Sequence, residues 1–274
     1  MNLKYSSRLI FALTMIAIGI LSLVSGGFGG IWGGVPKSLP DRQFLAYASM
    51  LVSLACGAGL LANRTAAPAA FILSVFLIVW TVLFKVPVIV KNPLVEVAYQ
   101  SCGENLVLIA GAWTLFASLA DEQGNAGLAK LAGPAGRRIA YLIYALALIA
   151  FGFSHFAYLN LTVPLVPGWL PKPLFWAYFT GSIYIATGFL IVTGLAVRLG
   201  AVISAIQIAL ITFLVWGPFV LKGPIGFESL GEPVVSWALT AAAFVVAESL
   251  SGQPWFHRFH GRAMETGAAV ESAL

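Results

Sequence analysis

The chain has 274 residues, of which 60% are hydrophobic and only 9% charged, and its mean hydropathy is +0.94. This composition leaves too little polar surface to cover a water-soluble globule, so lipid must be part of the solvent. The net charge of +5 comes from Lys and Arg scattered singly between apolar runs, which excludes the basic patch of a nucleic-acid-binding protein.

Four apolar segments in the first half of the chain are long enough to cross a bilayer as helices. A helix needs roughly 20 mainly apolar residues to do so, because only a helix satisfies its own backbone hydrogen bonds in hydrocarbon. The segments are residues 9–26, 44–62, 66–86 and 103–120. The first of them follows Lys4 and Arg8 and also fits a secretory signal peptide.

A polar, Gly-rich stretch, residues 122–137, then separates two halves, 1–121 and 138–250, and a polar tail follows at 251–274. Four further apolar segments lie in the second half. They are residues 139–155, 175–194, 199–216 and 234–248. The sequence therefore predicts an all-α integral membrane protein with eight transmembrane helices.

The distribution of Lys and Arg predicts the orientation. With eight spans both termini lie on one side, and nine of the 15 Lys and Arg fall on that side, including Lys130, Arg137 and Arg138 around the linker. Basic residues favour the cytoplasmic side of a membrane. We expect cytoplasmic termini and a location in a cell inner membrane.

An internal repeat is the strongest signal in the chain. Residues of the first half recur 131 positions later, with no gap from one block to the next. The pairs include Pro36 and Pro167, Pro40 and Pro171, Phe44 and Phe175, Gly57 and Gly188, Pro87 and Pro218, and Lys91 and Lys222. Four spans per half give both halves the same orientation, so we predict two parallel four-helix bundle repeats. Cleavage of a signal peptide would leave the first half one helix short.

The repeated features gather in the connections on the predicted outer side. Residues 27–43 and 156–174 are rich in Gly, Pro and Trp, whereas the turns at 63–65 and 195–198 on the other side are short. Proline fixes the backbone of long loops, and loops carry function. Binding or chemistry is therefore expected at the outer face, although these prolines also fit plain helix termination.

Three motifs of the second half resemble the DoxX family of small four-helix membrane proteins. They are Phe151-Gly-Phe-Ser-His155-Phe156, Val166-Pro-Gly-Trp-Leu-Pro171 and Phe175-Trp-Ala-Tyr-Phe-Thr-Gly181. The resemblance covers residues 138–198, and reaches the first half only through the repeat. It implies a four-helix bundle and contact with quinones or with membrane redox partners.

His155 is the candidate catalytic residue. It lies at the outer end of the fifth span beside aromatic residues, where it can hydrogen-bond a quinone carbonyl or relay a proton. A helix-end histidine bonded to a backbone carbonyl, Glu228 or Glu232 gives the same pattern. The first half departs from the motif, because Val24 or Ser25 stands where its histidine is expected.

Further candidate ligand-binding residues lie at the same outer depth. Lys85 and Glu104 end and begin neighbouring spans, and either clamp the structure as an ion pair or form a substrate or proton site. Lys91 and Lys222 either attract an anionic ligand or extend from the interface to water.

Polar residues of the sixth and seventh spans are expected to face the bundle interior. They are Tyr178, Thr180, Tyr184, Thr187 and Gln207, and Tyr178 and Tyr184 are candidate ligand contacts.

The sequence lacks the ligands for a membrane haem, an iron–sulfur cluster or structural zinc, so any electrons are expected to move through a bound quinone, the cofactor that the resemblance implies, or through a partner subunit. The preferred function is a membrane subunit of a quinone-linked redox system that binds quinone or docks a redox partner at its outer face. Two alternatives stay open: a small-molecule transporter with a cavity between the halves, and a non-catalytic assembly or anchoring protein.

Overall fold

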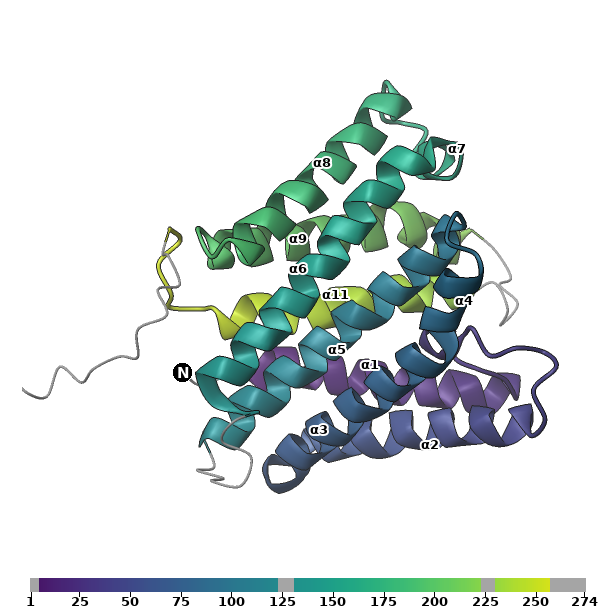
Figure 1. Cartoon of the computed structure of the whole chain (residues 1–274), viewed down its shortest axis with the longest axis vertical. Coiled ribbons are helices and arrows are strands. Elements are labelled where there is room, and N and C mark those ends of the chain that lie inside the picture. Colours follow the sequence, from purple (N-terminus) through teal and green to yellow (C-terminus); the bar gives the residue numbers. More distant parts are fainter. Residues whose placement is uncertain (1–4, 123–130, 223–229, 257–274) are drawn as a thin grey trace, which may run out of the picture.

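The computed structural model describes residues 5–122, 131–222 and 230–256, and throughout this part the chain is built from helices joined by short connections (Figure 1). The first half contains α1 (Tyr5–Ser25), η1 (Gly30–Trp32), α2 (Arg42–Leu61), α3 (Asn63–Trp80), η2 (Thr81–Lys85), α4 (Val86–Lys91) and α5 (Glu96–Glu122). The second contains α6 (Gly133–Ala157), α7 (Leu159–Thr162), η4 (Val163–Leu165), α8 (Pro173–Val192), α9 (Val197–Ile211), η5 (Thr212–Trp216), α10 (Gly217–Leu221) and α11 (Gly231–Ser249). The prediction of an all-α fold is confirmed.

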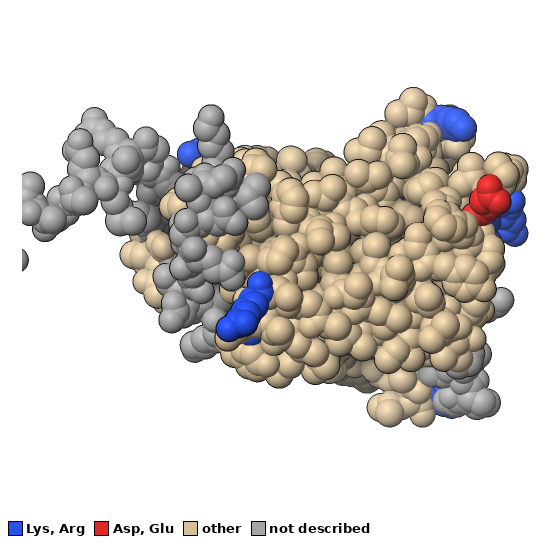
Figure 2. Space-filling model, turned by 90° about the horizontal axis from the view of Figure 1, so that it is seen from below, with Lys and Arg blue, Asp and Glu red and all other residues tan. Residues whose placement is uncertain are grey.

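Seven helical segments in the described part are long and apolar enough to cross a membrane. Charged side chains lie toward the two ends of the face in Figure 2, and the surface between them is free of Lys, Arg, Asp and Glu. A band of this kind matches the hydrocarbon core of a bilayer, so the chain is a multi-pass membrane protein.

The expected eighth span, residues 234–248, forms helix α11, which is not among these seven. Glu232 and Glu248 lie near its ends and lower its apolar character. Much of α11 is buried between neighbouring helices, where small residues such as Ala241, Ala242 and Ala243 pack closely. A helix inside the bundle needs fewer lipid-compatible side chains than one at the surface.

Several boundaries differ from the sequence-based expectations. Residues 63–65, expected as a turn, form the first turn of α3, and Ala62 alone separates α2 from α3. Helix α6 begins at Gly133, so Arg137, which was expected in the linker at residues 122–137, is helical, as is Arg138. Pro134 stands at the start of α6, where a missing N–H has no cost.

The connections that follow the third span of each half also differ from expectation. Pro87 and Pro218 were expected in loops or at helix ends, but each is the second residue of a short helix, α4 or α10. A π-helical segment, η2 or η5, precedes each of these helices. Helices tolerate proline when such a wider turn accommodates the missing N–H and the ring.

Helix packing runs in the same order in both halves. Helix α1 packs on α2, α2 on α3 and α3 on α5, and likewise α6 packs on α8, α8 on α9 and α9 on α11. Between the halves, α5 packs on α6 and α1 on α11. Figure 1 shows α4 and α7 at one end of the bundle, which we call the α7 end, and the N-terminus at the other.

Helices α5 and α11 meet at the centre through positions that are 131 residues apart. A Cβ atom on Gly111 would lie 2.8 Å from the Cβ of Ala242. Contact between two matching positions is the arrangement that a two-fold axis between repeated halves produces. Asp41 and Lys172, also 131 apart, share a left-handed backbone with φ of 57° and 56°. These features support the duplication, which we put forward as a proposal.

Candidate functional site

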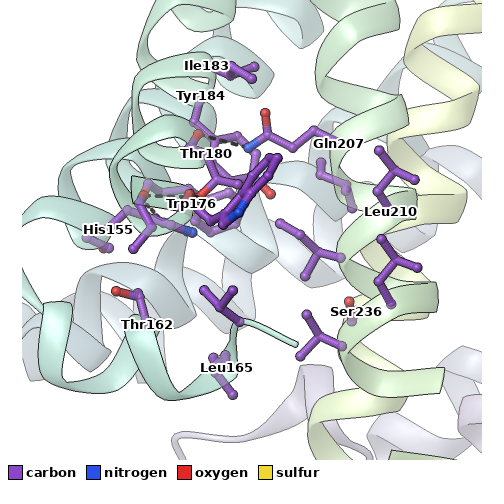
Figure 3. Close-up of a pocket in the computed structure, with 18 of the residues that line it drawn as sticks. His155, Thr162, Leu165, Trp176, Thr180, Ile183, Tyr184, Gln207, Leu210 and Ser236 are labelled. Atoms are coloured by element: carbon purple, nitrogen blue, oxygen red, sulfur yellow. Dashed lines mark hydrogen bonds between the residues drawn. The ribbon is translucent and has the colours of Figure 1, made fainter. Parts of the chain in front are cut away.

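A cavity of about 420 Å³ lies inside the second half, between α6, α8, α9 and α11 (Figure 3). The connection that contains α7 and η4 borders it at the α7 end. Its volume falls within the roughly 300–1,000 Å³ typical of small-molecule sites. The polar side chains that line it are Gln100, Glu104, Ser154, His155, Tyr158, Thr162, Trp176, Thr180, Tyr184, Gln207, Trp216, Glu232 and Ser236.

His155 reaches the cavity from the last turns of α6. Two glycines bring α6 and α8 close together here: a Cβ on Gly152 would lie 2.8 Å from the carbonyl oxygen of Gly181. The Nδ1 atom of His155 is 2.9 Å from the carbonyl oxygen of Phe151. Because a carbonyl only accepts, Nδ1 carries the proton and Nε2 is left as an acceptor. The histidine thus makes the helix-end hydrogen bond and also lines the cavity.

The first-half counterpart of His155 is Ser22, which corrects the expectation of Val24 or Ser25. Gly57 packs on Ile16 as Gly188 packs on Ile149, so the first helices of the two halves match at an offset of 133. The hydroxyl of Ser22 donates to the carbonyl of Ile18, as His155 does to Phe151. The connection after this helix is therefore two residues longer in the first half than in the second, and the difference lies before Pro36, from which the offset is 131.

Tyr184 and Gln207 form the deeper polar wall of the cavity. The Nε2 atom of Gln207 donates to the carbonyl oxygen of Thr180 at 2.9 Å, shown as a dashed line in Figure 3. This bond fixes the orientation of the Gln207 amide, because only its NH₂ group can donate to a carbonyl oxygen. The Oε1 atom of Gln207 is buried and has no hydrogen-bond partner among the described residues. The Tyr184 ring lies 5.5 Å from the His155 ring, centroid to centroid, and is only 4% exposed.

One side of the cavity opens toward the lipid-facing surface. Phe179 of α8 and Ile206 and Leu210 of α9 line the cavity and are also exposed on the outside of the bundle. Trp176 forms part of the wall, and its Nε1 donates to the carbonyl oxygen of Pro171 at 2.9 Å. An apolar molecule can therefore enter from the bilayer without crossing water.

Carboxyl groups lie at another part of the cavity wall. Glu104 of α5 and Glu232 of α11 line it, and Gln100 Nε2 donates to Glu104 Oε1 at 3.4 Å. Lys85 lies nearby but outside the lining, and its ammonium donates to the hydroxyl of Ser101. Both glutamates lie close enough to Lys85 to interact with its charge. The ion pair expected between Lys85 and Glu104 is therefore part of a cluster of three charged side chains, in which the hydrogen bond of Lys85 goes to Ser101.

The seven predicted site residues divide into three groups. The cavity brings together Glu104, His155 and Tyr184. Lys85 is buried behind it, while Lys91, Tyr178 and Lys222 are exposed and do not line it.

Tyr178 was expected to face the interior but is 40% exposed, and its ring lies 5.5 Å from that of Phe156. The buried face of α8 passes through Ala177, Gly181 and Tyr184 instead.

Sequence reasoning missed several residues of the site. Gln207 was noted only as a buried polar group, and Trp176 and Leu165 were not singled out although both line the cavity. Trp176 lies within the motif that carried the resemblance. No signal in the sequence singled out Leu165, because the offset of 131 places Trp32 on Val163 and not on Leu165. Within the described part of the chain, no three His, Cys, Asp or Glu side chains gather as metal ligands.

Comparison with known proteins gives one family. The DoxX family model matches residues 4–86, which span α1, α2, α3 and η2 and end at the first residue of α4. The match therefore lies in the first half, whereas the motifs that suggested the family lie in the second. No curated protein and no solved structure matches the chain.

Proposed function

From the membership of residues 4–86 in the DoxX family, we propose that this membrane protein binds a quinone in the cavity of its second half, as a membrane subunit of a quinone-linked redox system. The observation that carries the proposal is the cavity itself. It is largely apolar, opens to lipid, and places His155, Tyr184 and Gln207 in its wall.

These residues fit the head group of a quinone. A quinone offers two carbonyl acceptors and a quinol two hydroxyl groups, and each form needs partners inside an apolar site. Tyr184 supplies a hydroxyl donor, and His155 Nε2 supplies an acceptor. His155 Nε2 accepts a hydrogen bond from a quinol hydroxyl, whereas the carbonyl of the oxidised quinone offers it no donor, so the reduced form is expected to bind more tightly.

The carboxyl groups suit the exchange of protons between the cavity and water. Glu104 and Glu232 line the wall near the α7 end, and Lys85 lies close to both. We place this end at the outer face because most Lys and Arg lie on the side of the termini. When bound, the quinone supplies the redox chemistry, and the side chains hold it and take or give its protons.

The alternative functions have less support. A transporter built from parallel repeats is expected to have a cavity between its halves, but this cavity lies within the second half and touches the first only through Gln100 and Glu104. An anchoring protein needs no such cavity.

Binding of 2,3-dimethyl-1,4-naphthoquinol to the protein in lipid nanodiscs tests the proposal, with quenching of tryptophan fluorescence as the readout. We expect saturable binding that His155→Ala weakens about tenfold or more, since it removes one hydrogen bond in an apolar site. Tyr178→Phe is the matched control, because Tyr178 is exposed and does not line the cavity. Absence of binding to the unmodified protein, or equal binding by the His155→Ala variant, contradicts the proposal.

A further inference from the structure

In the first half, a tryptophan fills the region that corresponds to the cavity. Trp32 ends the short helix η1 and is fully buried. Its Nε1 donates to the hydroxyl of Ser53 at 2.8 Å. Its ring packs edge-on against Phe76 and Trp80, with centroids 5.4 and 5.3 Å away.

The three residues around Trp32 correspond to three residues of the cavity wall. At the offset of 131, Ser53 matches Tyr184, Phe76 matches Gln207 and Trp80 matches Ile211. All three second-half residues line the cavity. The space that Trp32 occupies in one half is therefore the space that stays open in the other.

The connections that supply the filling side chain also match. Helix η1 spans Gly30–Trp32 and η4 spans Val163–Leu165, and the offset of 133 found for the first helices places Trp32 on Leu165. Leu165 lines the cavity but is 45% exposed, so it leaves the space unfilled. Phe84 of the first half, which packs on Trp80, likewise has the smaller Val215 as its match.

We propose that Trp32 is a built-in counterpart of the ligand, and that the cavity holds a planar two-ring head group in the position of the Trp32 indole. The polar atom on the edge of this head group points to Tyr184, as the indole N–H points to Ser53. The head group lies against Gln207 and Ile211, and its apolar tail leaves between α8 and α9.

This inference rests on the proposed function for the identity of the ligand, and deepens it by naming the ring system. An indole has two fused rings, which matches the head of a naphthoquinol better than that of a benzoquinol. The first half shows that the surrounding four-helix bundle encloses a fused pair of rings without strain on its packing, since Trp32, Phe76 and Trp80 keep ordinary ring contacts.

Leu165→Trp tests the position of the ring by copying the first half into the second. We expect it to weaken 2,3-dimethyl-1,4-naphthoquinol binding at least about tenfold in nanodiscs, because the new ring takes the place of the ligand. Leu174→Trp is the control, since Leu174 is half exposed on α8 and does not line the cavity. Unchanged binding by Leu165→Trp overturns the inference, as does tighter binding of 2,3-dimethoxy-5-methyl-benzoquinol than of the naphthoquinol.

Indole provides a second test that does not depend on quinones. It should raise the thermal unfolding temperature of the unmodified protein, and Leu165→Trp should abolish this effect. Trp32→Gly and Trp32→Leu should be stabilised further by indole, which fills the space left in the first half. If indole acts in this way while no quinol binds, the inference about the ring position stands and the proposed function fails. If indole stabilises none of these proteins, the inference fails.

Discussion

Replacement of Gln207 by Leu should stabilise the protein and weaken ligand binding at the same time. The Gln207 side chain is 7% exposed, and its Oε1 is buried without a partner among the described residues. An unsatisfied buried acceptor costs about 1–3 kcal/mol, and Leu removes it at similar volume. The substitution loses the bond from Nε2 to Thr180, worth about 0.6 kcal/mol in membrane proteins. The net expectation is a gain of about 1 kcal/mol.

The Thr180 carbonyl does not become unsatisfied in this variant. Thr180 lies inside helix α8, where the backbone N–H four residues later is its regular partner. For binding, Gln207→Leu removes the amide that lies beside the Tyr184 hydroxyl and orients it toward the ligand. We expect the affinity for the naphthoquinol to fall about tenfold, the loss that one hydrogen bond of about 1.4 kcal/mol produces.

Thermal unfolding in detergent and quinol binding in nanodiscs measure the two effects on one preparation. Ser204→Ala is the contrasting variant, since Ser204 is buried, bonds to Tyr144 at 3.0 Å and does not line the cavity. It leaves the Tyr144 hydroxyl without that partner, so it should destabilise by about 1–3 kcal/mol with unchanged binding. A Gln207→Leu variant that is less stable and binds quinol normally would refute the reasoning, because Gln207 would then serve the fold and not the ligand.

Three further outcomes are expected. Gly111→Val should destabilise the protein by about 1–3 kcal/mol in thermal unfolding, because the added Cβ would meet Ala242 at 2.8 Å; a neutral effect would contradict the close α5–α11 contact. Lys85→Glu should lower stability by about 3 kcal/mol or more, since it puts a buried carboxylate close to the carboxyl groups of Glu104 and Glu232, whereas Lys85→Met should be tolerated. Single cysteines at Asn63 and Arg198 should be labelled from the same, cytoplasmic, side by a membrane-impermeant maleimide; labelling from opposite sides would exclude parallel halves.

The helices were predictable because their signal is local. Each long helix needs an apolar run of sufficient length, and all eight predicted segments are helical. Their ends were less predictable: α3 begins at Asn63 and α6 at Gly133, since polar residues at the membrane surface extend a helix as readily as they end it. The π-helical turns before Pro87 and Pro218 had no local signal beyond the prolines, which also fit a loop.

The candidate site was predictable only in part. His155, Glu104 and Tyr184 stood out because polar groups at membrane depth are costly, and the cavity brings them together. The same rule also selected Lys91 and Lys222, which are exposed, because periodicity does not say how far a side chain extends from its helix. The prediction that Tyr178 faces the interior was wrong because the glycines that contact α6 decide which face of α8 is buried.

The sequence by itself determined that this chain is a membrane protein, that it is helical, and that its two halves share a residue pattern. The length of an apolar run and the spacing of repeated residues can be read from the linear order, and a segment that crosses lipid must be helical to satisfy its own backbone hydrogen bonds. Only the tertiary structure decided which half has an open site. Trp32 and Leu165 look like ordinary loop residues in the sequence, but packing places the first inside its bundle and leaves the second beside a cavity. Whether a space is filled depends on the combined volume of side chains from several helices, and no single segment of the sequence specifies that volume.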